Sequence, residues 1–213
     1  MNHQYHFVTT WRVDALCGEV ADILGDPLAL PRWWPAVYLD AEETAPGDAQ
    51  GRGRRVALHT KGWLPYTLQW ELEVVESRYP QGFAIVARGD LDGRGVWTIE
   101  QDGRHTRATY DWQLHAQKPL VRRLSFLLKP LFEANHRWAM AQGAESLVLE
   151  LARRRASSDE ARQAVPPPPG PITYAGVALL AGATAIIGGA AYLAVRRYRS
   201  RSDRSDASAR SQP

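Results

Sequence analysis

The sequence predicts an α+β domain in which an antiparallel sheet of six or seven strands is covered by one long C-terminal helix. Apolar and polar residues alternate along most of residues 37–116, which is typical of strands with one buried face. Short segments rich in Gly, Pro and Asp separate these runs, as expected for antiparallel hairpins. Residues 119–155 instead carry apolar side chains at steps of three and four, which predicts a helix with one apolar face. Because an apolar sheet face needs a covering layer, this helix is expected to lie on it.

The first elements precede this meander. Residues 5–11 alternate and predict a half-buried strand. Asp14 is expected to cap a helix over residues 15–24, with Leu16 among its inward-facing side chains. A second short helix is predicted over residues 28–34.

The meander supplies the remaining strands. Leu68, Trp70 and Leu72 share one face of a strand, and Tyr110 and Trp112 share one face of another. The apolar face of the sheet is therefore rich in tryptophan. The predicted strands cover residues 37–45, 54–60, 66–77, 83–88, 96–101 and 105–116.

The C-terminal helix has two unusual features. Pro130 lacks the N–H of an uninterrupted helix, so we expect a short helix to end near Leu128 and a long one to follow. Asn135 and Gln142 interrupt the apolar stripe where a packed helix normally carries Leu or Ala. Their presence indicates that this face lines something other than a dry core.

Charge separates the chain into two parts. Residues 1–156 contain 19 Lys and Arg against 19 Asp and Glu, so the net charge of +3 belongs to the remaining residues. The basic balance is therefore no argument for nucleic-acid binding by the domain. The single cysteine, Cys17, excludes an internal disulfide and is compatible with a reducing compartment. The first residues have neither the basic nor the apolar region of a secretory signal.

Composition changes after residue 156. Residues 157–171 form a Pro-rich segment that predicts an extended linker. Residues 172–195 contain no charged side chain, and as a helix they would rise about 36 Å, enough to cross a bilayer core of about 30 Å. Residues 196–213 are then a basic tail. Representative positions of the predicted single transmembrane helix are Ile172, Tyr174, Leu179, Gly182, Ile186, Gly189, Tyr192 and Val195.

Two questions about this segment remain open at this stage. The Ala- and Gly-rich residues 172–195 also fit a buried hairpin or helix of a soluble domain. In a membrane, the positive-inside rule places the arginine-rich tail in the cytoplasm. The lone cysteine and the N-terminus without a signal instead favour a cytoplasmic domain whose tail crosses. We expect the second orientation, with the protein anchored in the membrane by a single pass near its C-terminus.

The domain resembles a known superfamily. The resemblance rests on the first strand and turn at residues 11–15 (WRVDA), the helix at residues 19–24 (EVADIL) and the phrase at residues 26–35 (DPLALPRWWP). Together with the long strands and the amphipathic last helix, residues 5–155 resemble the START-like (SRPBCC) superfamily and its polyketide cyclase/dehydrase and lipid-transport group. The resemblance implies a helix-grip fold with a deep cavity for a lipid or another hydrophobic small molecule. The catalytic members share no motif, so the resemblance assigns no catalytic residue.

Candidate cavity residues follow from the alternation of side chains along the strands and from the apolar face of the C-terminal helix. An apolar pocket with a few polar groups suits a hydrophobic ligand, although the same aromatic side chains could simply fill a core. Trp33 and Trp34 are expected at the cavity mouth or between the short helices and the sheet. The predicted cavity residues are Leu68, Trp70, Leu72, Trp97, Tyr110, Trp112, Asn135, Trp138 and Gln142.

Candidates for acid–base chemistry are few. Only His59, His115 and His136 have a side chain of the suitable pKa type, and His136 adjoins the inner face of the helix. Tyr110 is a second candidate for proton transfer. A lone helical histidine is more often a surface or packing residue, so both assignments are weak. No spacing typical of a metal site or of a phosphate-binding loop occurs, and we predict no metal and no cofactor.

Three functions fit these observations. The first is a membrane-anchored protein that binds or transfers a lipid or another hydrophobic small molecule. The second is a cyclase or dehydratase acting on a polyketide-like or other apolar substrate. The third is an interaction domain whose core is closed. The sequence does not identify the ligand or the oligomeric state.

Overall fold

The computed structural model describes residues 4–115 and 119–173. Seven strands form one antiparallel sheet in the order β1-β7-β6-β5-β4-β3-β2, and a long helix follows the last strand. The predicted α+β class is therefore confirmed. The elements are β1 (Gln4–Val13), α1 (Cys17–Leu24), η1 (Pro27–Ala29), α2 (Leu30–Trp33), β2 (Tyr38–Ala45), β3 (Arg55–Lys61), β4 (Thr67–Arg78), β5 (Gly82–Gly89), β6 (Asp92–Asp102), β7 (His105–His115), α3 (Pro119–Arg155) and α4 (Asp159–Ala164).

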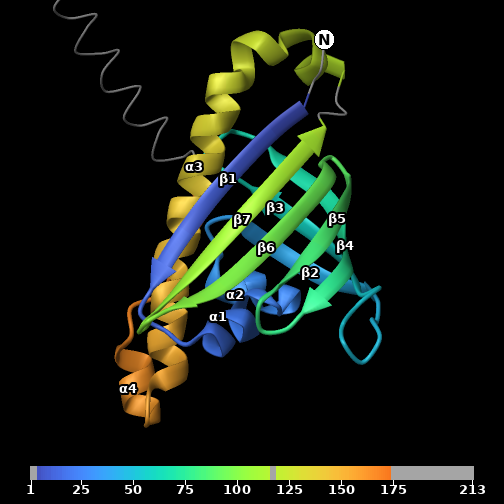
Figure 1. The fold of residues 1–213 in the computed structure, drawn as a ribbon. Helices are drawn as coiled ribbons and strands as arrows, with labels where there is room; N and C mark the ends of the chain where they lie inside the picture. Colours follow the sequence, from blue (N-terminus) through green and yellow to red (C-terminus); the bar gives the residue numbers. More distant parts are fainter. Residues whose placement is uncertain (1–3, 116–118, 174–213) are drawn as a thin grey trace, which may run out of the picture. The chain divides into compact units, whose positions relative to one another are not determined.

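The sheet is curved, and the helices occupy its concave side and one of its ends. Figure 1 shows β1, β7 and β6 in front of β2, β3 and β4, with α3 running the length of the sheet. The short helices α1 and α2 lie at the end of the sheet where the later part of α3 passes. The earlier part of α3 thus lies along the sheet, whereas its later part lies beside α1 and α2.

Helix α3 differs from the prediction at Pro130. The structure has one helix from Pro119 to Arg155 with Pro130 inside it, so the expected break near Leu128 is wrong. Proline removes one backbone hydrogen bond, which the long helix tolerates. Figure 1 shows the first turns of α3 running at an angle to the rest of the helix.

The start of α1 also differs from the prediction. The helix is preceded by Leu16 as its N-cap residue, not by Asp14, and the Leu16 side chain is 66% exposed instead of facing inward. The Leu16 N–H donates to the Glu19 carboxylate at 2.8 Å. Glu19 therefore satisfies the free backbone donor that an Asp cap would have satisfied.

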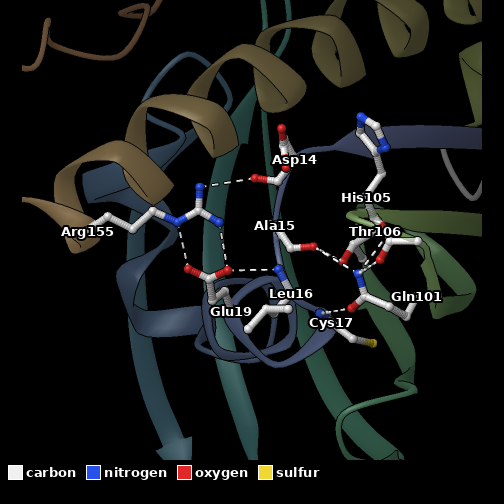
Figure 2. A network of polar contacts seen from close by, with 10 residues as sticks. Asp14, Ala15, Leu16, Cys17, Glu19, Gln101, His105, Thr106 and Arg155 are labelled. Carbon is white, nitrogen blue, oxygen red and sulfur yellow. Dashed lines mark hydrogen bonds and ion pairs between the residues drawn. The ribbon is translucent and has the colours of Figure 1, made fainter.

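A second contact links α1 to the end of α3. Figure 2 shows the Arg155 guanidinium against Glu19, to which it donates two hydrogen bonds of 2.7 Å, and against the Asp14 carbonyl. These bonds lower the pKa of Glu19 to about 2, chiefly through Arg155 and next through the Leu16 N–H. The positive end of α3 is thereby fixed beside the first turn of α1.

The polar contacts around Ala15 join the same corner to the sheet. The Thr106 hydroxyl donates to the Ala15 carbonyl at 2.7 Å, and Gln101 accepts from the Cys17 N–H at 2.7 Å (Figure 2). Both partners lie next to the β6–β7 turn. The loop between β1 and α1 is therefore held by the sheet as well as by α3.

Glu150 is the most deeply buried charged side chain of the described residues. Its carboxylate is 1% exposed and accepts two hydrogen bonds from Arg32, at 2.8 and 2.9 Å, and one from Arg154 at 2.9 Å. Burial alone would raise the pKa of Glu150, but the arginine hydrogen bonds outweigh it and the net shift is downward. This group connects α2 to α3.

The densely packed part of the core lies around these contacts. Gly143 of α3 faces the indole of Trp34, where a Cβ would overlap the ring. The close approach of helix and indole therefore requires glycine at this position. The fully buried side chains from α1, α2, the β6–β7 end of the sheet and the last third of α3 are Val20, Ile23, Trp33, Ile99, Thr106, Ser146, Leu147 and Glu150.

Replacement of Glu150 tests this contact between the helices. We expect Glu150→Ala to lower the free energy of unfolding by about 3 kcal/mol, since removal of one partner leaves a buried ion pair uncompensated. Glu100→Ala, which removes an exposed carboxylate paired with Arg107, should change it by less than about 1 kcal/mol. Urea denaturation measures both. Equal effects of the two substitutions would contradict the assigned role of Glu150.

Candidate ligand-binding cavity

A cavity of about 1390 Å³ lies between the sheet and the part of α3 that precedes the packed end. It exceeds the range of about 300–1,000 Å³ that is usual for small-molecule sites. All seven strands contribute to one wall, and residues 131–140 of α3 form the opposite one. Residues 21–30 of the short helices and Trp34 line the cavity as well. The interpretation as an interaction domain with a closed core depended on the absence of such a cavity, so it loses its basis.

Aromatic rings form much of the sheet wall. Trp97 and Tyr110 stack with centroids 4.5 Å apart, and Tyr110 and Trp112 stack at 5.5 Å. Trp70 approaches Trp112 at 6.1 Å, and its Nε1–H donates to the Thr60 hydroxyl at 3.0 Å. This wall is therefore largely apolar, and the Trp70 indole N–H already has an acceptor within the protein.

The structure brings together most of the predicted cavity residues. Trp138 and Gln142 are both half-buried and do not line the cavity. They lie on a different side of α3 from the observed lining residues Ala139 and Met140. The prediction followed the stripe through Asn135, Trp138 and Gln142, whereas the observed face continues from Asn135 to Ala139 and Met140. The predicted residues that do line the cavity are Leu68, Trp70, Leu72, Trp97, Tyr110, Trp112 and Asn135.

Asn135 has a structural contact as well as a place at the cavity. Its Oδ1 accepts the Trp63 N–H at 3.0 Å, and a Cβ at Gly62 would overlap its amide group. The β3–β4 loop is thus fastened to α3 at the edge of the cavity. This hydrogen bond gives a reason for a polar residue in the helix stripe that does not involve a ligand.

His136 lies on the cavity in a mostly apolar setting. Its ring stacks on Phe7 with centroids 4.3 Å apart, and its Nε2 is 3.4 Å from the Thr9 hydroxyl. Burial lowers the pKa of His136 to about 4, so the imidazole is neutral at pH 7. Of the other predicted histidines, His59 is half-buried on β3 and does not line the cavity, and the His115 side chain lies outside the described residues.

Several cavity residues were not predicted. Tyr5, Trp34 and Tyr38 all line the cavity. The Tyr5 hydroxyl and the Trp34 Nε1–H are buried and have no hydrogen-bond partner among the described residues. Such donors are costly to bury unpaired, so they suit an acceptor oxygen on a ligand. The alternation in residues 5–11 placed Tyr5 on the same face as Trp11 and could have identified it.

The tyrosine hydroxyls remain protonated at ordinary pH. Burial raises the pKa of Tyr5, Tyr38 and Tyr110, and the proximity of Tyr38 adds to the shift of Tyr110. These groups can therefore donate hydrogen bonds, whereas neutral His136 can accept a proton. The cavity combines a large apolar surface with a small number of polar groups, as hydrophobic-ligand sites do.

A curved antiparallel sheet around a long C-terminal helix, with an apolar cavity between them, is the helix-grip fold that the resemblance implied. Residues 4–152 match the family model described as polyketide cyclase/dehydrase and lipid transport. The chain belongs to this family. A comparison with curated proteins found no match.

Two solved structures illustrate the shared fold. The protein TTHA0849 from Thermus thermophilus is 19% identical, with a TM-score of 0.57, and the match covers 72% of this chain and 100% of that one. The ZhuI aromatase/cyclase from Streptomyces sp. R1128 is 18% identical, with a TM-score of 0.58, and the match covers 74% and 99% of the two chains. At these identities the similarity concerns the fold and not the ligand.

Two further properties concern the described residues only. Within residues 4–115 and 119–173, no group of three or more His, Cys, Asp or Glu side chains is placed to hold a metal ion. None of the helices in that part of the chain is both long enough and apolar enough to span a bilayer. The predicted span over residues 172–195 lies outside the described residues from Tyr174 onward.

NMR titration of His136 tests the description of the cavity. We expect its midpoint at about pH 4, because burial disfavours the imidazolium ion. The unfolded chain then binds more protons than the folded one between about pH 6.5 and 4, so the contribution of His136 to stability decreases as the pH falls through this window. His136→Gln identifies the resonance. A midpoint near 6.5 would show that His136 is exposed to water.

Proposed function

We propose that this protein is a membrane-anchored binding or transfer protein for a lipid or another hydrophobic small molecule. The observation that carries the proposal is the cavity of about 1390 Å³ beneath α3, with its wall of stacked aromatic rings. Transfer of an apolar ligand from water to such a wall is favourable in proportion to the apolar area that is buried. The unpaired Tyr5 and Trp34 donors suit a ligand that carries at least one acceptor oxygen.

The membrane anchor is the part of the proposal that rests on the sequence. The uncharged residues 172–195 are long enough for one transmembrane helix, and arginines follow them directly. Tethering would keep the cavity near the phase in which an apolar ligand dissolves. The cytoplasmic location of the domain remains a prediction of the same kind.

Occupancy of the cavity tests the binding proposal. Native mass spectrometry and lipid extraction of the purified full chain should detect a bound apolar molecule. Ala139→Phe, which places a ring at a cavity-lining position, should reduce the occupied fraction several-fold because overpacking costs free energy. Ala141→Phe, on the exposed side of the same helix, is the matched control and should leave it unchanged. A cavity that is empty for every lipid class tested would refute the proposal.

The second candidate function is a cyclase or dehydratase acting on a polyketide-like or other apolar substrate. The placement of neutral His136 on the cavity favours it, with the Thr9 hydroxyl 3.4 Å from the imidazole. His136 is then the candidate proton acceptor, with its basicity reduced by the lowered pKa, and the protonated Tyr110 hydroxyl can donate a hydrogen bond to a developing oxyanion. The name of the Streptomyces relative, an aromatase/cyclase, agrees with this possibility.

Substitution of these two residues distinguishes the candidates. If the protein turns over an apolar polyketide-like substrate, His136→Gln and Tyr110→Phe should each lower kcat by about 100-fold. His59→Gln changes a histidine of β3 that does not line the cavity and should retain full activity. Turnover that survives in the double variant would remove the assignment of both residues.

A further inference from the structure

The Pro-rich segment after α4 is attached to the domain at both of its ends. The Arg153 guanidinium donates to the Pro166 carbonyl at 2.6 Å, and the Lys61 ammonium donates to the Ile172 carbonyl at 2.7 Å. Pro168 and Pro169, between these points, are half-buried. The segment that the sequence predicts to be an extended linker is therefore held on the domain from Pro166 to Ile172, which we call the strap.

The two attachment points lie far apart along α3. Arg153 is in the last turn of the helix, whereas Lys61 is next to the loop that Asn135 holds. The 18 residues between Asn135 and Arg153 correspond to roughly 27 Å of helix. Six residues in polyproline geometry cover roughly 19 Å, and the long Arg and Lys side chains reach the remainder. The strap thus returns the chain from the packed end of α3 towards the β3–β4 loop.

The β3–β4 loop is an edge of the cavity. Lys61, Gly62 and Leu64 line the cavity together with Pro65 and Tyr66, and the last two are exposed. Because residues that line the cavity are also exposed here, as they are at Gln50 and Tyr79, this loop is one of the places where the cavity reaches the protein surface. The chain therefore leaves the described domain beside an opening of the cavity.

The composition of this loop suits a membrane interface. Trp63 and Tyr66 each combine an apolar ring with a polar group, and Lys61 combines an apolar stem with an ammonium. Tyr66 is 41% exposed, and Pro65 beside it is exposed as well. Residues 172–195, which carry no charge, begin at the strap residue that Lys61 holds.

We propose that the β3–β4 loop end of the cavity lies against the bilayer, and that the apolar ligand passes between bilayer and cavity at this end. The inference rests on the proposed membrane anchor and adds an orientation to it. The strap sets the orientation, because it holds the start of residues 172–195 at Lys61. The turn between β4 and β5 then faces away from the bilayer, since the length of β4, roughly 35 Å, separates it from the loop.

Labels at the two ends of β4 test this orientation in the full chain. On a Cys17→Ser background, Thr67→Cys places a fluorophore next to the loop and Gln81→Cys places one in the β4–β5 turn. Both positions are exposed and neither lines the cavity. The protein is reconstituted into phosphatidylcholine–phosphatidylglycerol vesicles that contain a lipid with a nitroxide on its acyl chain. We expect quenching to be several-fold stronger at residue 67 than at residue 81.

The possible outcomes distinguish the proposed membrane anchor from the proposed orientation of the domain on the bilayer. Failure of the full chain to float with vesicles would refute the anchor, and the orientation with it. Flotation with equal quenching at both positions, or with stronger quenching at residue 81, would refute the orientation alone. Shielding of residue 67 that increases with protein concentration and is independent of the nitroxide would assign the loop to a second copy of the chain, which also overturns the proposal.

Removal of the strap contact at Lys61 tests its role. Lys61→Gln removes the contact to Ile172 and leaves Arg153, which also lies 3.5 Å from the buried Glu150 carboxylate, unchanged. It should reduce the difference in quenching between the two labels while the chain still floats with vesicles. Arg88→Gln removes an exposed guanidinium paired with Glu73 and is the matched control, for which the difference should persist. A difference that is unchanged in the Lys61→Gln variant would show that the strap does not orient the domain.

Discussion

The structure depends on the burial of one carboxylate where α3 crosses the short helices. Glu150 is 1% exposed, and its charge is compensated by hydrogen bonds from Arg32 and Arg154 and by the Arg153 guanidinium at 3.5 Å. These bonds, with the Gly143 contact to Trp34, fix the last third of α3 against α1 and α2. The preceding part of the helix contacts the sheet at β1, where His136 stacks on Phe7, and the cavity occupies the space between it and the remaining strands.

The aromatic residues serve different purposes on either side of this crossing. Trp33 and Trp34 are buried where the short helices meet α3. Trp97, Tyr110 and Trp112 stack in succession along the sheet, with Tyr110 between the two indoles, and all three line the cavity. Stacked rings hold one another in place through their mutual contacts. This wall can therefore keep its shape although no side chains pack against it across the cavity.

The fold and the strand side of the cavity were predictable because strand parity is a local property. Alternating residues point to opposite faces, so Leu68, Trp70 and Leu72 had to share one face once β4 was recognised. The helix side was less predictable. A helix offers several possible faces, and Trp138 looked more suitable than Ala139 for an apolar contact. The contacts of Gly143 with Trp34 and of Glu150 with Arg32, which are made only in the folded chain, determine which face of α3 points to the sheet.

The sequence by itself determined the order of elements, the Trp-rich face of the sheet and the presence of an uncharged segment long enough to span a bilayer. These properties follow from the periodicity, composition and length of individual segments, which do not depend on contacts with residues far away in the chain. The tertiary structure decided the neutral state of His136, the fastening of Asn135 to the β3–β4 loop and the return of the Pro-rich strap to Lys61. Each of these depends on burial or on a hydrogen bond between residues far apart in the chain.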